Sequence, residues 1–142
     1  MRQLHILLVE DNEGDIFLIR QALQECVSVN EISVARNGMQ AISTLNKNAV
    51  FDKECLPDLI FLDINLPVKN GFEVLQFIKS TEQLKHIPVL MLSTSSAEKD
   101  IMNAYSNHAS CFITKPFEYE GLQKIIASIN NFWFTEAKLP RR

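Results

Sequence analysis

The sequence predicts an α/β protein built on a doubly wound, five-stranded parallel sheet. Short apolar segments alternate five times with amphipathic segments, which is the order expected when helices connect parallel strands. One segment, Leu59 to Leu62, is continuously apolar, which is typical of a strand buried on both faces. Right-handed crossovers would then place helices over both faces of the sheet.

Length and composition indicate one domain and narrow the range of partners. The 142 residues suffice for a hydrophobic core, since 46% of them are hydrophobic. The net charge of -3 gives no general attraction to nucleic acid or anionic membranes, and no apolar run is long enough to span a membrane. Three widely spaced cysteines lack metal-ligand spacing and are expected to be reduced thiols in a cytoplasmic protein.

The first predicted strand, Leu4 to Val9, ends at the carboxylates Glu10 and Asp11. The next four residues, up to Asp15, are expected to form a turn and the start of a helix. Apolar side chains then recur at helical spacing from Ile16 to Cys26, which predicts the helix itself.

The second unit is a short strand, Glu31 to Ala35, followed by a break at Asn37-Gly38. Met39 to Leu45 is predicted as a helix because its apolar residues share one side. Residues 46–57 are irregular and polar, so we expect a long surface loop with room for one extra helical turn.

The third unit contains the central strand, which ends at Asp63. Pro67 and Asn70-Gly71 stop the strand and start a loop, and apolar residues from Phe72 to Ile78 predict a helix. Ligands bind at the carboxyl ends of strands in open sheets of this kind, although Asp63 alone could equally end the strand as a turn residue.

The last two units repeat the pattern. Val89 to Leu92 is predicted as a strand, and Ser95 and Glu98 have the capping-box spacing that starts a helix. Ser110 to Thr114 is the fifth predicted strand, and the final helix is expected from about Glu118.

Polar side chains stand where four of the predicted strands end. They are Glu10, Asp11, Asp63, Ser93 and Lys115. The carboxyl ends of all strands in such a sheet open on one edge, so these residues should share one crevice. Each has an ordinary explanation alone, such as helix capping, a turn or a solvated surface, but that explanation is much weaker for all five together.

The predicted crevice has the chemistry of a magnesium-dependent phosphoryl site. An oxygen-rich acidic site suits a hard cation, and Mg²⁺ takes one or two carboxylates and shares phosphate oxygens. A carboxylate can itself form an aspartyl-phosphate. Phosphoryl transfer needs in-line positioning and neutralised oxygen charge, which Mg²⁺, Lys115 and the Ser93 hydroxyl could supply.

Five short motifs carry these residues. They are Val9-Glu10-Asp11-Asn12, Leu62-Asp63-Ile64-Asn65-Leu66-Pro67, Asn70-Gly71, Leu92-Ser93 and Lys115-Pro116-Phe117. Together they are highly specific, and they resemble the motifs of bacterial two-component response regulator receiver domains from residue 4 to about residue 130. The resemblance implies a flavodoxin-like fold with strand order 2-1-3-4-5. It also implies a single-domain regulator, with the receiver in residues 1–131 and an extension of the last helix and a tail in residues 132–142.

The resemblance implies a role for each residue at the phosphoryl site. Asp63 matches the phosphoacceptor, Lys115 the lysine that pairs with phosphoryl oxygens, and Ser93 the switch hydroxyl. Phe112 matches the switch aromatic. The family usually has a cis bond before its proline, so the bond between Lys115 and Pro116 is expected to be cis.

The resemblance likewise implies an Mg²⁺ site. Asp11 matches the direct metal ligand and Glu10 the acidic neighbour that acts through water. Asp63 is shared with the phosphoryl site, and Asn65 matches the position whose backbone carbonyl binds the metal.

The function implied is that of a signalling protein and not of an enzyme. A sensor histidine kinase would phosphorylate Asp63, and the surface of the fourth helix, fifth strand and fifth helix would then change for protein–protein output. The alternatives are a phosphotransfer intermediate that passes the group to a histidine phosphotransfer domain and, less favoured, a pseudo-receiver that only binds proteins.

Two other classes fit the sequence less well. A haloacid dehalogenase phosphatase needs a second Asp two positions after Asp63 as general acid, and Asn65 cannot donate and retrieve that proton. A nucleotide-binding module needs a glycine-rich loop after the first strand, where this chain has Gly14 alone.

The C-terminal tail carries three large aromatic residues, Phe132-Trp133-Phe134. They either extend the last helix and fold back on the core or form a surface for a homodimer or a kinase. The face of the fourth helix, fifth strand and fifth helix is the other candidate dimer surface. This ending, with the long loop before Pro57, resembles single-domain regulators that partner phytochrome-type sensor kinases.

Overall fold

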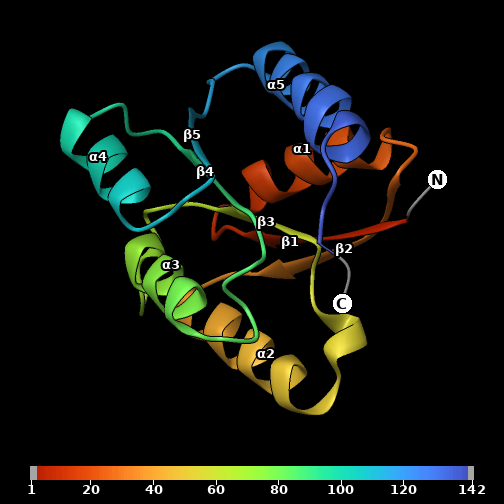
Figure 1. The fold of residues 1–142 in the computed structure, drawn as a ribbon. Helices are drawn as coiled ribbons and strands as arrows, with labels where there is room; N and C mark the ends of the chain where they lie inside the picture. The colour runs from red at the N-terminus through yellow and green to blue at the C-terminus, as the bar shows by residue number, and fades with distance from the viewer. Residues whose placement is uncertain (1–2, 141–142) are drawn as a thin grey trace.

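The computed structural model describes residues 3–140, in which five parallel strands alternate with five α-helices (Figure 1). The strands are β1 (Leu4–Val9), β2 (Val29–Ala35), β3 (Leu59–Leu62), β4 (Val89–Ser93) and β5 (Cys111–Thr114). They are ordered β2-β1-β3-β4-β5, and every neighbouring pair is parallel. This order confirms the predicted doubly wound, flavodoxin-like sheet.

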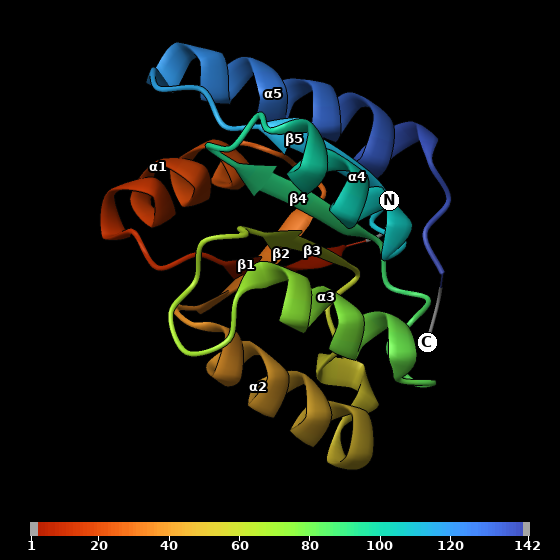
Figure 2. The same ribbon diagram turned by 90° about the vertical axis from the view of Figure 1, so that its left-hand side faces the viewer.

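The helices cover both faces of the sheet. They are α1 (Glu13–Gln24), α2 (Gly38–Phe51), α3 (Gly71–Ser80), α4 (Glu98–Ser106) and α5 (Tyr119–Asn131), with a 3-10 turn η1 (Lys53–Cys55) and a π-helical turn η2 (Phe132–Glu136). Helices α1 and α5 pack on one face, and α2 and α3 pack on the other (Figure 2). In the part of the chain described, no helix combines the length and apolar character needed to cross a membrane.

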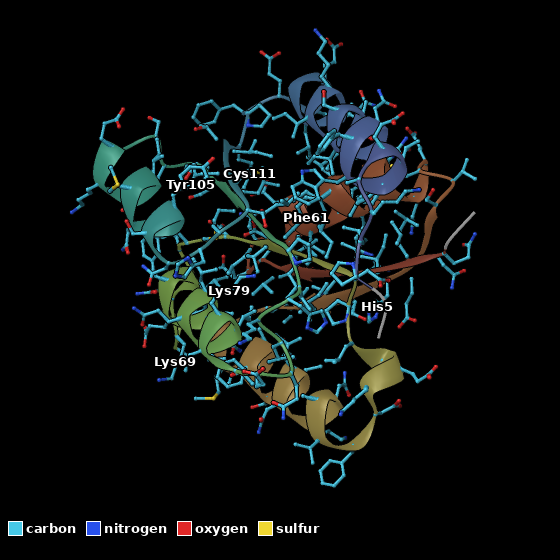
Figure 3. The ribbon with its side chains drawn as sticks, viewed as in Figure 1. His5, Phe61, Lys69, Lys79, Tyr105 and Cys111 are labelled. Atoms are coloured by element: carbon cyan, nitrogen blue, oxygen red, sulfur yellow. The ribbon has the colours of Figure 1, made fainter. Side chains whose placement is uncertain are left out.

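Strand β3 is buried completely because it lies between the two helical layers. Leu59 and Phe61 face the α1–α5 side, and Ile60 and Leu62 face the α2–α3 side. Phe61 accordingly lies near the middle of the molecule (Figure 3). A strand covered on both faces needs a continuous apolar run. Because β3 ends at Leu62, the next residue, Asp63, lies at the edge of the sheet.

Helix α2 is longer than the sequence predicted. It continues past Leu45 to Phe51, and η1 follows it, so the expected surface loop over residues 46–57 was wrong for most of its length. Leu45 and Ala49 lie one turn apart and are both buried, which extends the apolar stripe of the helix. Leu56 is buried as well and anchors the return of the chain to β3.

Helix α4 starts without the predicted capping box. It begins at Glu98, and its N-cap residue, Ala97, makes no side-chain cap. The Ser95 hydroxyl instead donates to the Asp100 carboxylate over 2.6 Å and accepts the Ala97 N–H over 3.2 Å. Ser95 therefore ties the loop after β4 to the first turn of α4.

The bond between Lys115 and Pro116 is trans, because no cis peptide bond occurs in residues 3–140. The prediction of a cis bond at this position is therefore wrong. Bonds before proline favour the trans form by about 0.5–1 kcal/mol, so a chain needs a specific tertiary constraint to hold the cis form.

The tail after α5 turns back onto the α1–α5 side of the molecule. Phe134 is buried there, while Trp133 and Leu139 pack partly against the same core. Phe132 points outward, with 57% of its surface exposed. Residues 1, 2, 141 and 142 of the expected receiver and tail lie outside the described residues.

Candidate functional site

The ends of β1, β3, β4 and β5 bring Glu10, Asp63, Ser93 and Lys115 to one edge of the sheet. The register of the ladders explains this. Val9 pairs with Leu62, so β1 and β3 end together, and Ser93 pairs with Thr114, so β4 and β5 end together. Leu62 pairs with Met91, so the second pair of strands ends two residues further along the same edge. The Lys115 N–H donates to the Ser93 carbonyl over 2.6 Å and holds the loop after β5 beside β4.

The Lys115 ammonium is the centre of this site. Its side chain is only 5% exposed, and Nζ donates to Glu10 Oε1 at 2.5 Å, Asp15 Oδ2 at 2.9 Å and Asp63 Oδ2 at 3.4 Å. Burial by itself lowers the pKa of the ammonium, but the hydrogen bonds to Glu10 and Asp15 and the charge of Asp63 outweigh it and raise the pKa above its usual value. Lys115 is therefore a fixed positive charge among carboxylates.

Glu10 is buried and held in one orientation. Its Oε2 accepts the backbone N–H groups of Asp11 and Asn12, each over 3.1 Å, while Oε1 accepts from Lys115. Burial raises the pKa of Glu10 to about 7, and the nearby charge of Asp63 acts in the same direction against the hydrogen bond from Lys115. Glu10 thus accepts three hydrogen bonds, while its burial disfavours the charged form.

Glu10, Asp11 and Asp63 form a group that can hold a cation. One carboxylate oxygen from each lies within 4.8 Å of the others; Asp11 is exposed to solvent, and the other two are buried. Such a set of oxygen donors fits a hard divalent cation such as Mg²⁺. Asn65 lies next to this group, since its N–H donates to Asp63 Oδ1 over 3.3 Å. We call Glu10, Asp11, Asp63 and Lys115 the acidic crevice.

Ser93 and Phe112 lie close to the acidic crevice, but within residues 3–140 their side chains make no hydrogen bond to its side chains. Ser93 is fully buried, and within residues 3–140 its hydroxyl accepts the Ser95 N–H over 3.3 Å and makes no hydrogen bond to a carboxylate. Phe112 is half-buried against the α2–α3 core. Its N–H donates to the hydroxyl of Tyr105, which reaches from α4 towards β5 (Figure 3).

The pattern of the response regulator receiver domain matches residues 6–127 of the chain. The chain belongs to the response regulator receiver family. Response regulator Rcp1 from Synechocystis sp. is 38% identical over 135 residues, which cover 95% of this chain and 92% of Rcp1.

Solved structures of receiver proteins agree in fold over nearly the whole chain. The phosphorylated cyanobacterial phytochrome response regulator RcpA superposes with a TM-score of 0.91 at 44% identity and covers 98% of this chain and 99% of its own. The Mn²⁺-bound form of Rcp1 superposes with a TM-score of 0.89 at 37% identity and covers 97% and 99%. Both comparisons support a receiver fold without missing elements.

The receiver site contains one contact that the sequence did not reveal. Asp15 was expected only in the turn before α1, yet its carboxylate bonds Lys115, which is 100 residues away in the sequence. Its one sequence signal is an acidic residue one helical turn after Asp11. That spacing could not show that the first turn of α1 faces the end of β5.

Proposed function

We propose that this receiver is a stand-alone response regulator that accepts a phosphoryl group on Asp63 from a sensor histidine kinase. The observation that carries the proposal is the buried Lys115 ammonium, which contacts the carboxylates of both Glu10 and Asp63. A phosphoryl group on Asp63 would carry roughly one and a half to two negative charges in place of the single charge of the carboxylate, and Lys115 is placed to pair with its oxygens.

In the proposed reaction, a carboxylate oxygen of Asp63 attacks the phosphorus of a phosphohistidine. The new oxygen–phosphorus bond forms as the nitrogen–phosphorus bond breaks, and the imidazole leaves. Lys115 neutralises charge on the transferred oxygens. The product is an acyl phosphate, so the protein is a signalling component that is itself modified and not a classical enzyme.

Mg²⁺ is the cofactor proposed for this reaction. Glu10, Asp11, Asp63 and the backbone carbonyl of Asn65 would hold it, and it would neutralise phosphoryl oxygen charge when bound. The three carboxylates within 4.8 Å support this assignment, as does the Mn²⁺-bound form of the relative Rcp1. Because both Glu10 oxygens already accept hydrogen bonds, we assign Glu10 to contact through water.

The proposed switch passes from the phosphoryl group to the surface formed by α4, β5 and α5. Ser93 would give up its bond with the Ser95 N–H to reach the phosphoryl group, and Ser95 in turn is bonded to Asp100 on α4. Phe112 would change rotamer as the loop after β4 moves, next to Tyr105 of α4. The changed surface would be read by a protein partner.

The proposed upstream partner is a phytochrome-type sensor kinase, by analogy with RcpA, a phytochrome response regulator. We also propose a cytoplasmic protein with its receiver in residues 1–131 and its tail in residues 132–142, and without a nucleic-acid or membrane partner. A homodimer would form through the tail, where a groove of about 380 Å³ is lined by α5 and by Phe132 and Trp133. The α4–β5–α5 face is the second candidate surface.

Transfer of labelled phosphate from a phosphorylated sensor kinase tests the proposed function. The wild-type protein should become labelled when Mg²⁺ is present and not in excess chelator. The Asp63→Asn variant should stay unlabelled, while Asp52→Asn, which changes an exposed aspartate outside the site, should label normally. Normal labelling of Asp63→Asn would overturn the assignment of the phosphoacceptor.

A further inference from the structure

Asp15 is a third carboxylate on the Lys115 ammonium, outside the residues assigned to the metal and the phosphoryl group. Its Oδ2 lies 2.9 Å from Lys115 Nζ, which is shorter than the 3.4 Å between Nζ and Asp63 Oδ2. With Asp15 included, four carboxylates surround the site, so a divalent cation and Lys115 no longer neutralise it. Lys115 is therefore shared between the phosphoacceptor and a competitor.

From the local sequence of α1, Asp15 would be expected to complete a capping box at the start of the helix. Helices α1 and α3 both have an Asn at the N-cap and an acidic residue three positions later. In α3, Glu73 completes the capping box by accepting the N-cap N–H of Asn70 over 3.2 Å. In α1, Glu10 occupies the N-cap N–H of Asn12 instead, which leaves the Asp15 carboxylate free to bond Lys115.

The backbone of Asp15 is nevertheless fixed. Its N–H donates to the Asn12 side chain over 2.9 Å, and this bond sets the position of the residue in the first turn of α1. The carboxylate of Asp15 is thus attached to a backbone position that is held in place. Replacement of the carboxylate by an amide would leave this backbone hydrogen bond unchanged.

Asp15 is the partner that Lys115 can release at the lowest cost. Its side chain is 35% exposed, so water can solvate the carboxylate once the ammonium leaves. The Glu10 side chain is 3% exposed and would remain as a buried, unpaired charge. A phosphoryl group on Asp63 that draws Lys115 closer would therefore break the bond to Asp15 first.

We propose that Asp15 is a positioning residue that withholds Lys115 from Asp63 and so weakens the binding of a phosphoryl group at this site. The inference rests on the proposed function, because it assigns to Asp15 a role in phosphoryl binding on Asp63. Asp15 acts through Lys115 and touches neither the acceptor nor the phosphoryl group. When the Asp15 carboxylate is ion-paired with Lys115, the ammonium is less available to the phosphoryl group, so less of the phosphorylated form accumulates.

The affinity for beryllofluoride in the presence of Mg²⁺, measured by calorimetry, tests the proposal. Asp15→Asn should bind this aspartyl-phosphate mimic about three- to thirtyfold more tightly than the wild type. Glu13→Gln is the matched control: it removes a negative charge from the same helical turn, but Glu13 pairs with Arg36 and not with Lys115. Unchanged or weaker binding by Asp15→Asn, or an equal gain in Glu13→Gln, would overturn the proposal.

A double-mutant cycle with Lys115→Met separates competition from a general effect of charge or folding. In that background Asp15→Asn should have no effect, since the ammonium for which Asp15 competes is gone. Asp15→Glu should restore weak binding in the presence of Lys115. The proposed function fails separately, if the wild type does not bind beryllofluoride or if Asp63→Asn binds it as the wild type does.

Discussion

Gly71 approaches the backbone of Asp63 so closely that a Cβ on Gly71 would lie 2.2 Å from the Asp63 carbonyl oxygen. The Gly71 N–H also donates to the Ile64 carbonyl over 2.8 Å. The first residue of α3 is therefore packed directly against the backbone of the proposed phosphoacceptor. The close approach, and not an unusual backbone conformation, explains why glycine stands here.

Gly71→Ala should destabilise the protein by about 1–3 kcal/mol, because either α3 or the Asp63 backbone must move to admit the methyl group. Urea denaturation measures the loss. Gly14→Ala is the control, since a Cβ there meets only the side-chain oxygen of Asn12 at 3.2 Å, and alanine favours the helix. Equal losses in the two variants would show that the contact with Asp63 is not the cause.

Asp63 and Gly71 show how much of the site could be predicted from the sequence. The continuous apolar run before Asp63 predicts a strand buried on both faces, and the alternation of segments predicts parallel strands that end at one edge. Those two local patterns are enough to bring Asp63 and Lys115 together. The Asn70-Gly71 pair predicts only a turn, because the distance from Gly71 to Asp63 depends on how α3 docks.

Tertiary docking also accounts for two further differences between prediction and structure. Asp15 bonds Lys115 only because α1 starts beside the end of β5. Helix α2 extends beyond Leu45 because Ala49 finds a buried position. Each outcome depends on neighbours distant in the sequence or on burial that local pattern does not set.

The two tyrosines of the chain should respond oppositely to loss of their hydroxyl groups. Within residues 3–140, the Tyr119 hydroxyl is the one buried side-chain oxygen or nitrogen atom without a hydrogen-bond partner. Tyr119→Phe should therefore raise the free energy of unfolding by about 1 kcal/mol. Tyr105→Phe removes the acceptor of the Phe112 N–H and should lower it by about 0.5–1.5 kcal/mol. Thermal and urea unfolding of both variants test this difference, and the same sign in both would contradict it.

Lys79 holds the chain between α3 and β4 through two backbone carbonyls. Its Nζ donates to the Lys85 carbonyl over 3.0 Å and to the Ile87 carbonyl over 2.7 Å. Lys79→Met keeps the length of the side chain but leaves both carbonyls without this donor, so we expect a loss of about 1–2 kcal/mol. Lys85→Met removes only an exposed ion pair with Glu82 and should change stability by less than about 0.5 kcal/mol.

The stabilising effect of Lys79 should grow at alkaline pH. Burial lowers the pKa of Lys79 below its usual value of 10.5. Between the lowered pKa and 10.5, the unfolded chain binds a proton at this lysine that the folded chain does not, so stability rises with pH across that window. The difference in unfolding free energy between the wild type and Lys79→Met should widen as the pH approaches 10. A constant difference from pH 7 to pH 10 would show that the folded lysine titrates normally.

The aromatic residues of the tail differ in role: one supports the fold, and another is exposed and can contact a second copy of the chain. Phe134 is 8% exposed and packs on the α1–α5 core, so Phe134→Ala should lower stability by about 3–5 kcal/mol. Phe132 is 57% exposed and makes an edge-to-face contact with Trp133, at 5.7 Å between ring centroids. Phe132→Ala should leave stability nearly unchanged.

Analytical ultracentrifugation of Phe132→Ala then tests the tail as an interface. The self-association constant should fall about tenfold relative to the wild type if Phe132 fills a pocket on a second copy. Deletion of the chain after Asn131 is a poorer test, because it also removes the buried Phe134 and weakens the fold. Unaltered association of a well-folded Phe132→Ala would exclude the tail and leave the α4–β5–α5 face, where Met102 and Tyr105 are exposed, as the surface to mutate next.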